Sequence, residues 1–118
     1  MEEINLRNYA YLGDAVWELF VREITILKTQ NANDLHKLTT GKVNAKFQHD
    51  LLMQIQKDLT EEELEILRRS RNLTVPIARK SNQSDYRMAT AFEALIGWWY
   101  KNDKPRLEEI EAILLNFL

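Results

Sequence analysis

Apolar residues recur at helical spacing along most of the chain, and no segment shows the apolar–polar alternation of an exposed strand. The first apolar segment predicts a helix over about residues 6–28. Its inward stripe is expected to consist of Leu12, Val16, Leu19 and Phe20, with Ile24 at the far end. This pattern predicts an all-α protein.

Capping residues divide the next part of the chain into short helices. Asn33 can cap a helix that carries Leu35 and Leu38 and stops near Gly41. A third helix is predicted from a run of apolar residues at helical spacing: Val43, Phe47, Leu51, Leu52 and Ile55. The sequence TEEE, residues 60–63, predicts a capping box at the start of a fourth helix.

The second half of the chain predicts one long loop and two further helices. Residues 72–84 are polar, contain Pro76 and show no clear period, which predicts a loop. Ser84 or Asp85 is expected to cap a helix with the apolar stripe Phe92, Leu95, Ile96 and Trp99. Pro105 suits the first turn of a final helix that carries Leu107, Ile110, Leu114 and Phe117. No internal repeat or change of composition divides residues 1–118, which predicts a single domain.

Composition narrows the class of protein. A chain of 118 residues suits one domain with a modest core. The absence of cysteine excludes disulfides and thiolate metal sites. No apolar run reaches the ~20 residues of a membrane span. The N-terminal sequence MEEINLRN lacks the basic start and apolar core of a signal peptide, so we expect a cytoplasmic protein.

Charge is unevenly distributed along the chain. The net charge is −2, yet residues 68–87 hold six basic residues and a single acid, a local charge of +5. A local basic patch of this kind can contact phosphates even in an acidic protein. The alternative is a solvated face without a partner.

Two acids in apolar helices are the main candidates for chemistry. Asp14 follows Gly13, and Glu93 precedes Gly97 by four residues. A buried carboxylate is costly unless a charged group compensates it, and an ion pair with Arg or Lys is the usual explanation for one such acid. Two acids in the same setting suggest a shared site, and carboxylate oxygens suit Mg²⁺. The glycines would let the two helices approach closely. Spacing alone leaves both interpretations open.

Five segments carry a resemblance to a known family. YLGDAV at residues 11–16 and FEALIG at 92–97 resemble the paired signature of the ribonuclease III catalytic domain. NDLHKLTTGKVNAKFQ at 33–48, TEEELEILRRSRN at 60–72 and YRMATAFEALIG at 86–97 resemble one branch, Mini-ribonuclease III. The resemblance follows the chain in order from about residue 8 to residue 101.

The resemblance implies an all-α endonuclease domain that cleaves double-stranded RNA by metal-assisted phosphodiester hydrolysis. Such enzymes are homodimers in which each active site cuts one strand. The mini branch has no separate RNA-binding domain, for which this chain is expected to leave no room, and it matures the ends of precursor 23S ribosomal RNA. By motif position, Asp14 and Glu93 are the catalytic, metal-binding acids. The implied cofactor is Mg²⁺, with Mn²⁺ as a substitute.

The chain departs from full-length members of the family around these two acids. The further acids that such enzymes carry are replaced here by Arg7, Ala10 and Thr90. The mini branch shares this reduced set, so the departures favour that assignment while leaving fewer ligands for a second metal. Glu18, one turn after Asp14, is expected to have a surface or structural role.

Positive charge near the predicted loop is expected to bind the RNA duplex, which proteins read largely by shape, phosphates and 2′-hydroxyls. The predicted RNA contacts are Arg68, Arg69, Arg71, Asn72, Arg79 and Lys80, with Lys46 and Gln48 as further candidates. His36 is expected to be structural. Four aromatic residues are expected in the core or in a homodimer contact: Trp17, Trp98, Trp99 and Tyr100.

Two other functions are compatible with the same fold. One is a non-catalytic helical module in which Asp14 and Glu93 form structural ion pairs and the basic loop binds an acidic protein. The other is a domain that binds structured RNA without cutting it. Mg²⁺-dependent cleavage of duplex RNA separates the enzyme from both.

Overall fold

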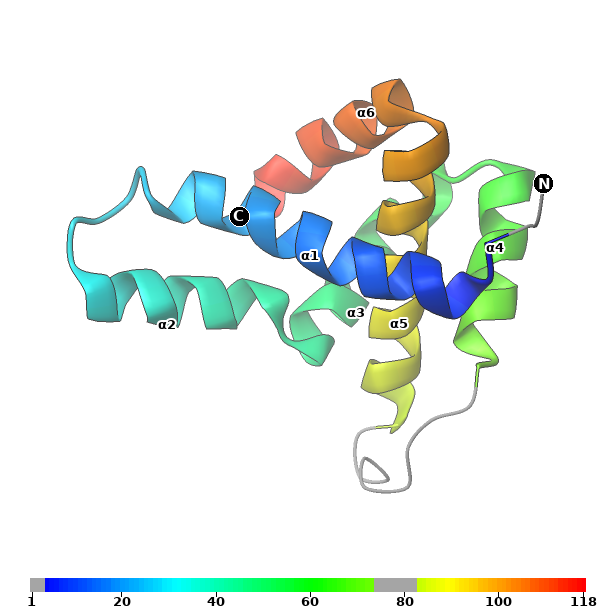
Figure 1. Cartoon of the computed structure of the whole chain (residues 1–118), viewed down its shortest axis with the longest axis horizontal. Coiled ribbons are helices and arrows are strands. Elements are labelled where there is room, and N and C mark those ends of the chain that lie inside the picture. Colours follow the sequence, from blue (N-terminus) through cyan, green and yellow to red (C-terminus); the bar gives the residue numbers. More distant parts are fainter. Residues whose placement is uncertain (1–3, 74–82) are drawn as a thin grey trace.

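A computed structural model describes residues 4–73 and 83–118, which form helices and no strand (Figure 1). The prediction of an all-α protein is therefore confirmed. The α-helices are α1 (Leu6–Thr25), α2 (Ala32–Val43), α3 (Ala45–Ile55), α4 (Glu61–Arg71), α5 (Gln83–Asn102) and α6 (Lys104–Leu114), with short 3-10 helices η1 (Gln56–Asp58) and η3 (Leu115–Phe117). Within the described ranges, no helix is long and apolar enough to cross a membrane.

Helix α5 is the centre of the fold, since α1, α3, α4 and α6 all pack against it (Figure 1). Its predicted apolar stripe is confirmed, because the following side chains are all buried in the core: Phe92, Leu95, Ile96 and Trp99. Helices α1 and α2 extend together to one side of this core (Figure 1). A polar side chain on α5 therefore lies between several other helices.

Helices α1 and α5 cross in close contact at two glycines. A Cβ atom placed on Gly13 would lie 2.6 Å from the carbonyl carbon of Glu93, and one on Gly97 would lie 2.8 Å from that of Tyr9. Neither glycine has a positive φ, so the backbone conformation does not require glycine. Glycine is required because the crossing leaves no room for a Cβ atom. The expectation that the glycines let the helices approach is confirmed.

The predicted inward stripe of the first helix is only partly correct, because Val16 and Phe20 pack against the edge of the core but other residues form the buried face. The buried face of α1 carries Tyr9, Ala10, Gly13, Trp17, Val21 and Thr25. Leu19 is 61% exposed, whereas Leu12, Val16, Phe20 and Ile24 are only partly buried. The reason is that the contact at Gly13 decides which face turns toward α5, so residues at i+4, i+8 and i+12 from Gly13 follow it into the core. A prediction that ranks side chains by hydrophobicity cannot detect this contact, because glycine has no side chain.

Several predicted helix ends also differ. Asn31, not Asn33, caps α2 through its side chain, and α2 continues past Gly41 to Val43. Gly41 is an ordinary helical residue here, because its φ is not positive. Asn44 caps the next helix by accepting a hydrogen bond from the backbone N–H of Phe47 at 2.9 Å.

The end of the predicted long loop is wrong as well. Helix α5 begins at Gln83, before both of the expected capping residues, Ser84 and Asp85. Most of the remaining predicted loop, residues 74–82, lies outside the described residues. The last helix is capped by Asp103 and has Pro105 in its first turn as expected, but Phe117 lies in η3 and is not buried.

The predicted capping box of α4 is confirmed and has a second role. Glu63 and Thr60 exchange hydrogen bonds at the start of α4. The buried Glu63 carboxylate also accepts hydrogen bonds from Trp99 Nε1 at 2.7 Å and from Arg106 Nε at 2.9 Å. Burial by itself would raise the pKa of Glu63, but these hydrogen bonds outweigh it and lower the pKa. The carboxylate thus ties α4 to α5 and α6.

Candidate active site

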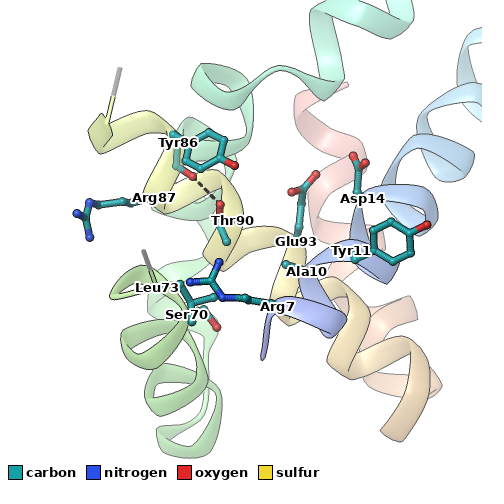
Figure 2. Close-up of a pocket in the computed structure, with 10 residues that line it drawn as sticks. All are labelled: Arg7, Ala10, Tyr11, Asp14, Ser70, Leu73, Tyr86, Arg87, Thr90 and Glu93. Carbon is teal, nitrogen blue, oxygen red and sulfur yellow. Dashed lines mark hydrogen bonds between the residues drawn. The ribbon is translucent and has the colours of Figure 1, made fainter. Parts of the chain in front are cut away.

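Asp14 and Glu93 line one cavity of about 240 Å³ between α1, α4 and α5. Asp14 comes from the middle of α1, and Glu93 lies beside the glycine crossing on α5. Figure 2 shows the two carboxyl groups pointing in the same direction, side by side. The structure therefore brings together the two acids that the sequence paired.

The environment of this pair disfavours two negative charges. Burial, a hydrogen bond with Asp14 and the charge of Asp14 together raise the pKa of Glu93 to about 8. A hydrogen bond from Gln48 acts in the opposite direction. At neutral pH the pair accordingly retains a proton on Glu93. A cation placed between the carboxylates would remove the repulsion and displace that proton.

The surroundings of the pair distinguish a metal site from a structural ion pair. Among residues 4–73 and 83–118, none of the ion pairs includes Asp14 or Glu93. Two neighbouring carboxylates without a basic partner have the chemistry of a site for a hard divalent cation. No cluster of three or more potential ligands from His, Cys, Asp and Glu exists in the described part of the chain. A cation here would take two protein ligands and complete its shell with water and substrate oxygens, as Mg²⁺ commonly does.

Gln48 lies in the protein interior beside Glu93 and not on the surface. Its side chain is 2% exposed, and Nε2 donates a hydrogen bond to Oε2 of Glu93 at 3.4 Å. This burial contradicts the expected contact with RNA. The sequence did contain a signal for burial, because Gln48 precedes Leu51, Leu52 and Ile55 by three, four and seven residues and so shares their helical face.

The other predicted RNA contacts occupy two places in the structure. Four exposed residues lie at the C-terminal end of α4, next to the cavity: Arg68, Arg69, Arg71 and Asn72. Arg68 forms an ion pair with Glu65 on its own helix. Lys46 is exposed on α3, where it pairs with Asp50. The remaining two candidates, Arg79 and Lys80, lie outside the described residues.

The remaining sequence candidates take structural or surface positions. Glu18 pairs with Arg22 at 2.8 Å on the surface of α1, as expected. His36 is exposed. Trp17 and Trp99 are core residues, whereas Trp98 is partly buried and Tyr100 is exposed.

The cavity has three further polar lining residues for which the sequence predicted no role: Arg7, Ser70 and Arg87. Arg7 was noted only as a replaced acid and Arg87 only as part of the basic stretch. The available signal was the spacing of Arg7, which lies seven residues, or two helical turns, before Asp14.

Known proteins resemble this chain over most of its length. The sequence family described as the ribonuclease III domain matches residues 7–104. Mini-ribonuclease 3 of Clostridium tetani is 41% identical over 120 residues, which cover 98% of this chain and 80% of the relative. Mini-ribonuclease 3 of Gloeobacter violaceus is 41% identical over 107 residues, covering 91% of this chain and 79% of the relative.

A solved structure also matches the fold. The crystal structure of protein FN1578 from Fusobacterium nucleatum superposes with a TM-score of 0.85 at 33% sequence identity, covering 98% of this chain and 94% of that one. The family match includes Asp14, Glu93 and both glycines of the crossing. The chain therefore belongs to the ribonuclease III family, in its Mini-ribonuclease III branch, and is an endoribonuclease.

Proposed function

We propose that this endoribonuclease cleaves double-stranded RNA by Mg²⁺-assisted hydrolysis at the pair formed by Asp14 and Glu93. The observation that carries the proposal is the geometry of that pair, two carboxyl groups side by side in a cavity without a basic partner among the described ion pairs. The alternative, a module that keeps the fold without catalysis, gives no reason for placing two repelling acids together.

Each protein group at the site has a defined task in this mechanism. Asp14 and Glu93 would hold the metal ion, and Glu93 would give up its proton when the metal binds. Mg²⁺ held by these two acids would supply a water of lowered pKa as the nucleophile and would neutralise charge on the phosphate. The amide of Gln48 restrains one oxygen of Glu93, which fixes how the carboxylate faces Asp14.

The close crossing of α1 and α5 determines how the two acids face each other. Gly13 and Gly97 permit the backbone contact between the helices, and Asp14 and Glu93 lie directly beside it. Because both acids sit on helices, their separation follows from the packing of the backbone and not from a loop. Such rigidity is what a site with only two protein ligands requires.

The biological substrate that we propose is the precursor of 23S ribosomal RNA. Relatedness to proteins named Mini-ribonuclease 3 supports it, because the resemblance noted in the sequence implies this role for that branch. A cytoplasmic location is the expectation for an enzyme that acts on ribosomal RNA. Mn²⁺ is expected to replace Mg²⁺, since both prefer oxygen ligands.

We further propose that the enzyme acts as a two-fold homodimer. Exposed apolar side chains lie along α1 and at its C-terminal cap, with Tyr11 85% exposed and Leu19 and the capping residue Ile26 also exposed. An isologous contact could cover these side chains and place two active sites for the two strands of a duplex. Sedimentation at micromolar concentration is expected to show a dimer. Cleavage at that concentration by a protein that sediments only as a monomer would contradict this part of the proposal.

The experiment that tests the function is a cleavage assay with a long RNA duplex. The duplex should be cut in the presence of Mg²⁺ and remain intact with EDTA, and the matching single strand should be a poor substrate. Binding of the duplex with no cleavage in Mg²⁺ or Mn²⁺ would favour a non-catalytic RNA-binding domain. Neither binding nor cleavage would leave a protein-interaction module.

A further inference from the structure

The cavity that contains Asp14 and Glu93 also has a basic end. Arg7 of α1 and Arg87 of α5 line the same cavity, and Figure 2 shows the guanidinium of Arg87 at its outer edge, extending away from Arg7. In Figure 2 the guanidinium of Arg7 extends toward Ser70 and Leu73 on the side of α4, away from the two carboxyl groups. Arg7 precedes Asp14 by two helical turns, which is a rise of roughly 10 Å along α1. The cavity is therefore acidic at one end and basic at the other.

The two arginines retain hydrogen-bond donors for a ligand. No ion pair of the described residues contains Arg7 or Arg87. Arg87 donates one hydrogen bond, from Nη1 to the carbonyl oxygen of Arg71 at 3.4 Å. A guanidinium has five N–H donors in a planar fork that matches the oxygens of a phosphate.

An unpartnered hydroxyl lies in the wall at this end. Ser70 is 0% exposed, and in the described part of the chain its Oγ is the one buried side-chain polar atom without a hydrogen-bond partner. Ser70 lines the same cavity as Arg7 and Arg87. A buried hydroxyl without a partner is unfavourable, and an oxygen acceptor of a ligand would relieve it.

We infer that Arg7, Ser70 and Arg87 form a subsite for a phosphate of the RNA strand, next to the phosphate that is cut. This phosphate subsite rests on the proposed function, because it takes its ligand from the same substrate. A phosphodiester offers only acceptor oxygens and a negative charge, which the basic end attracts and the acidic end, without its metal, does not. The polarity of the cavity thus sets where along the strand the acids act. Arg7 is a positioning residue in this scheme.

RNA binding in EDTA tests the subsite without any cleavage. Arg7→Gln is expected to weaken the binding of a short RNA duplex about tenfold and to reduce the slope of log K against log salt by about one, because one phosphate contact is lost. Arg7→Lys should be intermediate, because it retains the charge without the fork. The matched control is Arg22→Gln, which removes the same charge from α1 outside this cavity and should bind as the wild type does. An Arg7→Gln variant that matches the control in affinity and salt slope would overturn the inference.

Two further measurements test the role of the Ser70 hydroxyl and the source of the bound phosphate. Ser70→Ala should weaken RNA binding without lowering the melting temperature. A lowered melting temperature with unchanged binding would mean that the hydroxyl contributes only to packing and not to RNA binding.

Inorganic phosphate should compete with RNA for binding to the wild type, and it should compete less for Arg7→Gln. Phosphate binding that Arg7→Gln abolishes, with RNA affinity unchanged, would assign the subsite to free phosphate and overturn the RNA proposal. Absence of cleavage by the wild type in Mg²⁺ would refute the proposed function instead. The binding measurements in EDTA do not depend on cleavage, so they would still test the phosphate subsite.

Discussion

Substitution of Gly97 by alanine tests the role of the helix crossing most sharply. The added Cβ would lie 2.8 Å from the carbonyl carbon of Tyr9 and 3.0 Å from the backbone nitrogen of Gly13, and the carbonyl oxygen of Tyr9 is closer still. All of these atoms belong to the backbone of α1, so no side chain can rotate away. Restoring an ordinary carbon contact of 3.4 Å requires α1 and α5 to separate by at least about 0.6 Å.

The expected cost follows from two opposing effects. Alanine gains roughly 1 kcal/mol over glycine in a helix interior. Overpacking at a tight contact costs about 1–3 kcal/mol or more, and the separation also loosens the packing of α1 on α5. We expect Gly97→Ala to lower the free energy of unfolding by about 2 kcal/mol. For a chain of this size, that lowers the melting temperature by roughly 5–10 °C.

Gly41→Ala is the matched control. Gly41 lies inside α2 with no positive φ, and an added Cβ would meet nothing within 4 Å. The same substitution should therefore raise stability there, by up to about 1 kcal/mol. Urea denaturation followed by circular dichroism measures both variants. Equal effects of the same sign at Gly97 and Gly41 would refute the reasoning about the crossing.

The same substitution should also affect catalysis. Separation of α1 from α5 moves Asp14 relative to Glu93, and displacements of about 1 Å can cost on the order of a hundredfold in rate. Cleavage by Gly97→Ala should be measured well below its melting temperature, where the protein is folded. A stable, folded variant with full activity would show that the acids tolerate a wider crossing.

Three further predictions concern single side chains. In EDTA the folded state should lose stability as pH rises from about 4.5 to about 8, because folded Glu93 keeps a proton that the unfolded chain releases. Glu111, whose burial raises its pKa to about 7, contributes in the same direction at lower pH, so Glu93→Gln should reduce this dependence, most clearly above about pH 7. An unchanged dependence in urea denaturation would contradict the raised pKa of Glu93. Glu63→Gln should destabilise the protein by on the order of 2–3 kcal/mol, since it removes the buried partner of Arg106 and leaves, among the described residues, only the exposed Glu109 to pair with it; a change below about 0.5 kcal/mol by the same assay would contradict the role given to the ion pair. Gln48→Leu should raise the Mg²⁺ concentration needed for half-maximal cleavage about tenfold or more, so that activity partly recovers at high Mg²⁺; loss of RNA affinity with an unchanged Mg²⁺ requirement would instead place Gln48 in RNA binding.

The sequence predicted those parts of the fold that depend on local signals. The capping box at Thr60 and the apolar stripe of α5 need only neighbouring residues, and both are confirmed. The second role of Glu63 was not predictable in this way, because its partners Trp99 and Arg106 lie 36 and 43 residues away. The repeated pairing of an acid with a glycine was a local pattern with a tertiary cause. It suggested a shared site for Asp14 and Glu93, and the resemblance to the ribonuclease III domain then assigned that site.

The errors share a physical origin in contacts between distant helices. On α1 two apolar stripes competed, and the close approach at Gly13, a residue without a side chain, decided between them. Gln48 was predicted as a further RNA contact, although a partly buried carboxylate such as that of Glu93 needs polar neighbours of this kind. No role was predicted for Arg7, because its proposed function becomes apparent only from the cavity that it shares with Asp14.

Single-turnover cleavage of a preformed RNA complex tests the central claim, that Asp14 and Glu93 form one metal-dependent catalytic site. Protein in excess is bound to a duplex without divalent metal, and the reaction is started with Mg²⁺. The account predicts that the wild type cuts the bound duplex, whereas Asp14→Asn and Glu93→Gln bind the same fraction of RNA and leave it intact. Cleavage by either variant at the wild-type rate would contradict the account.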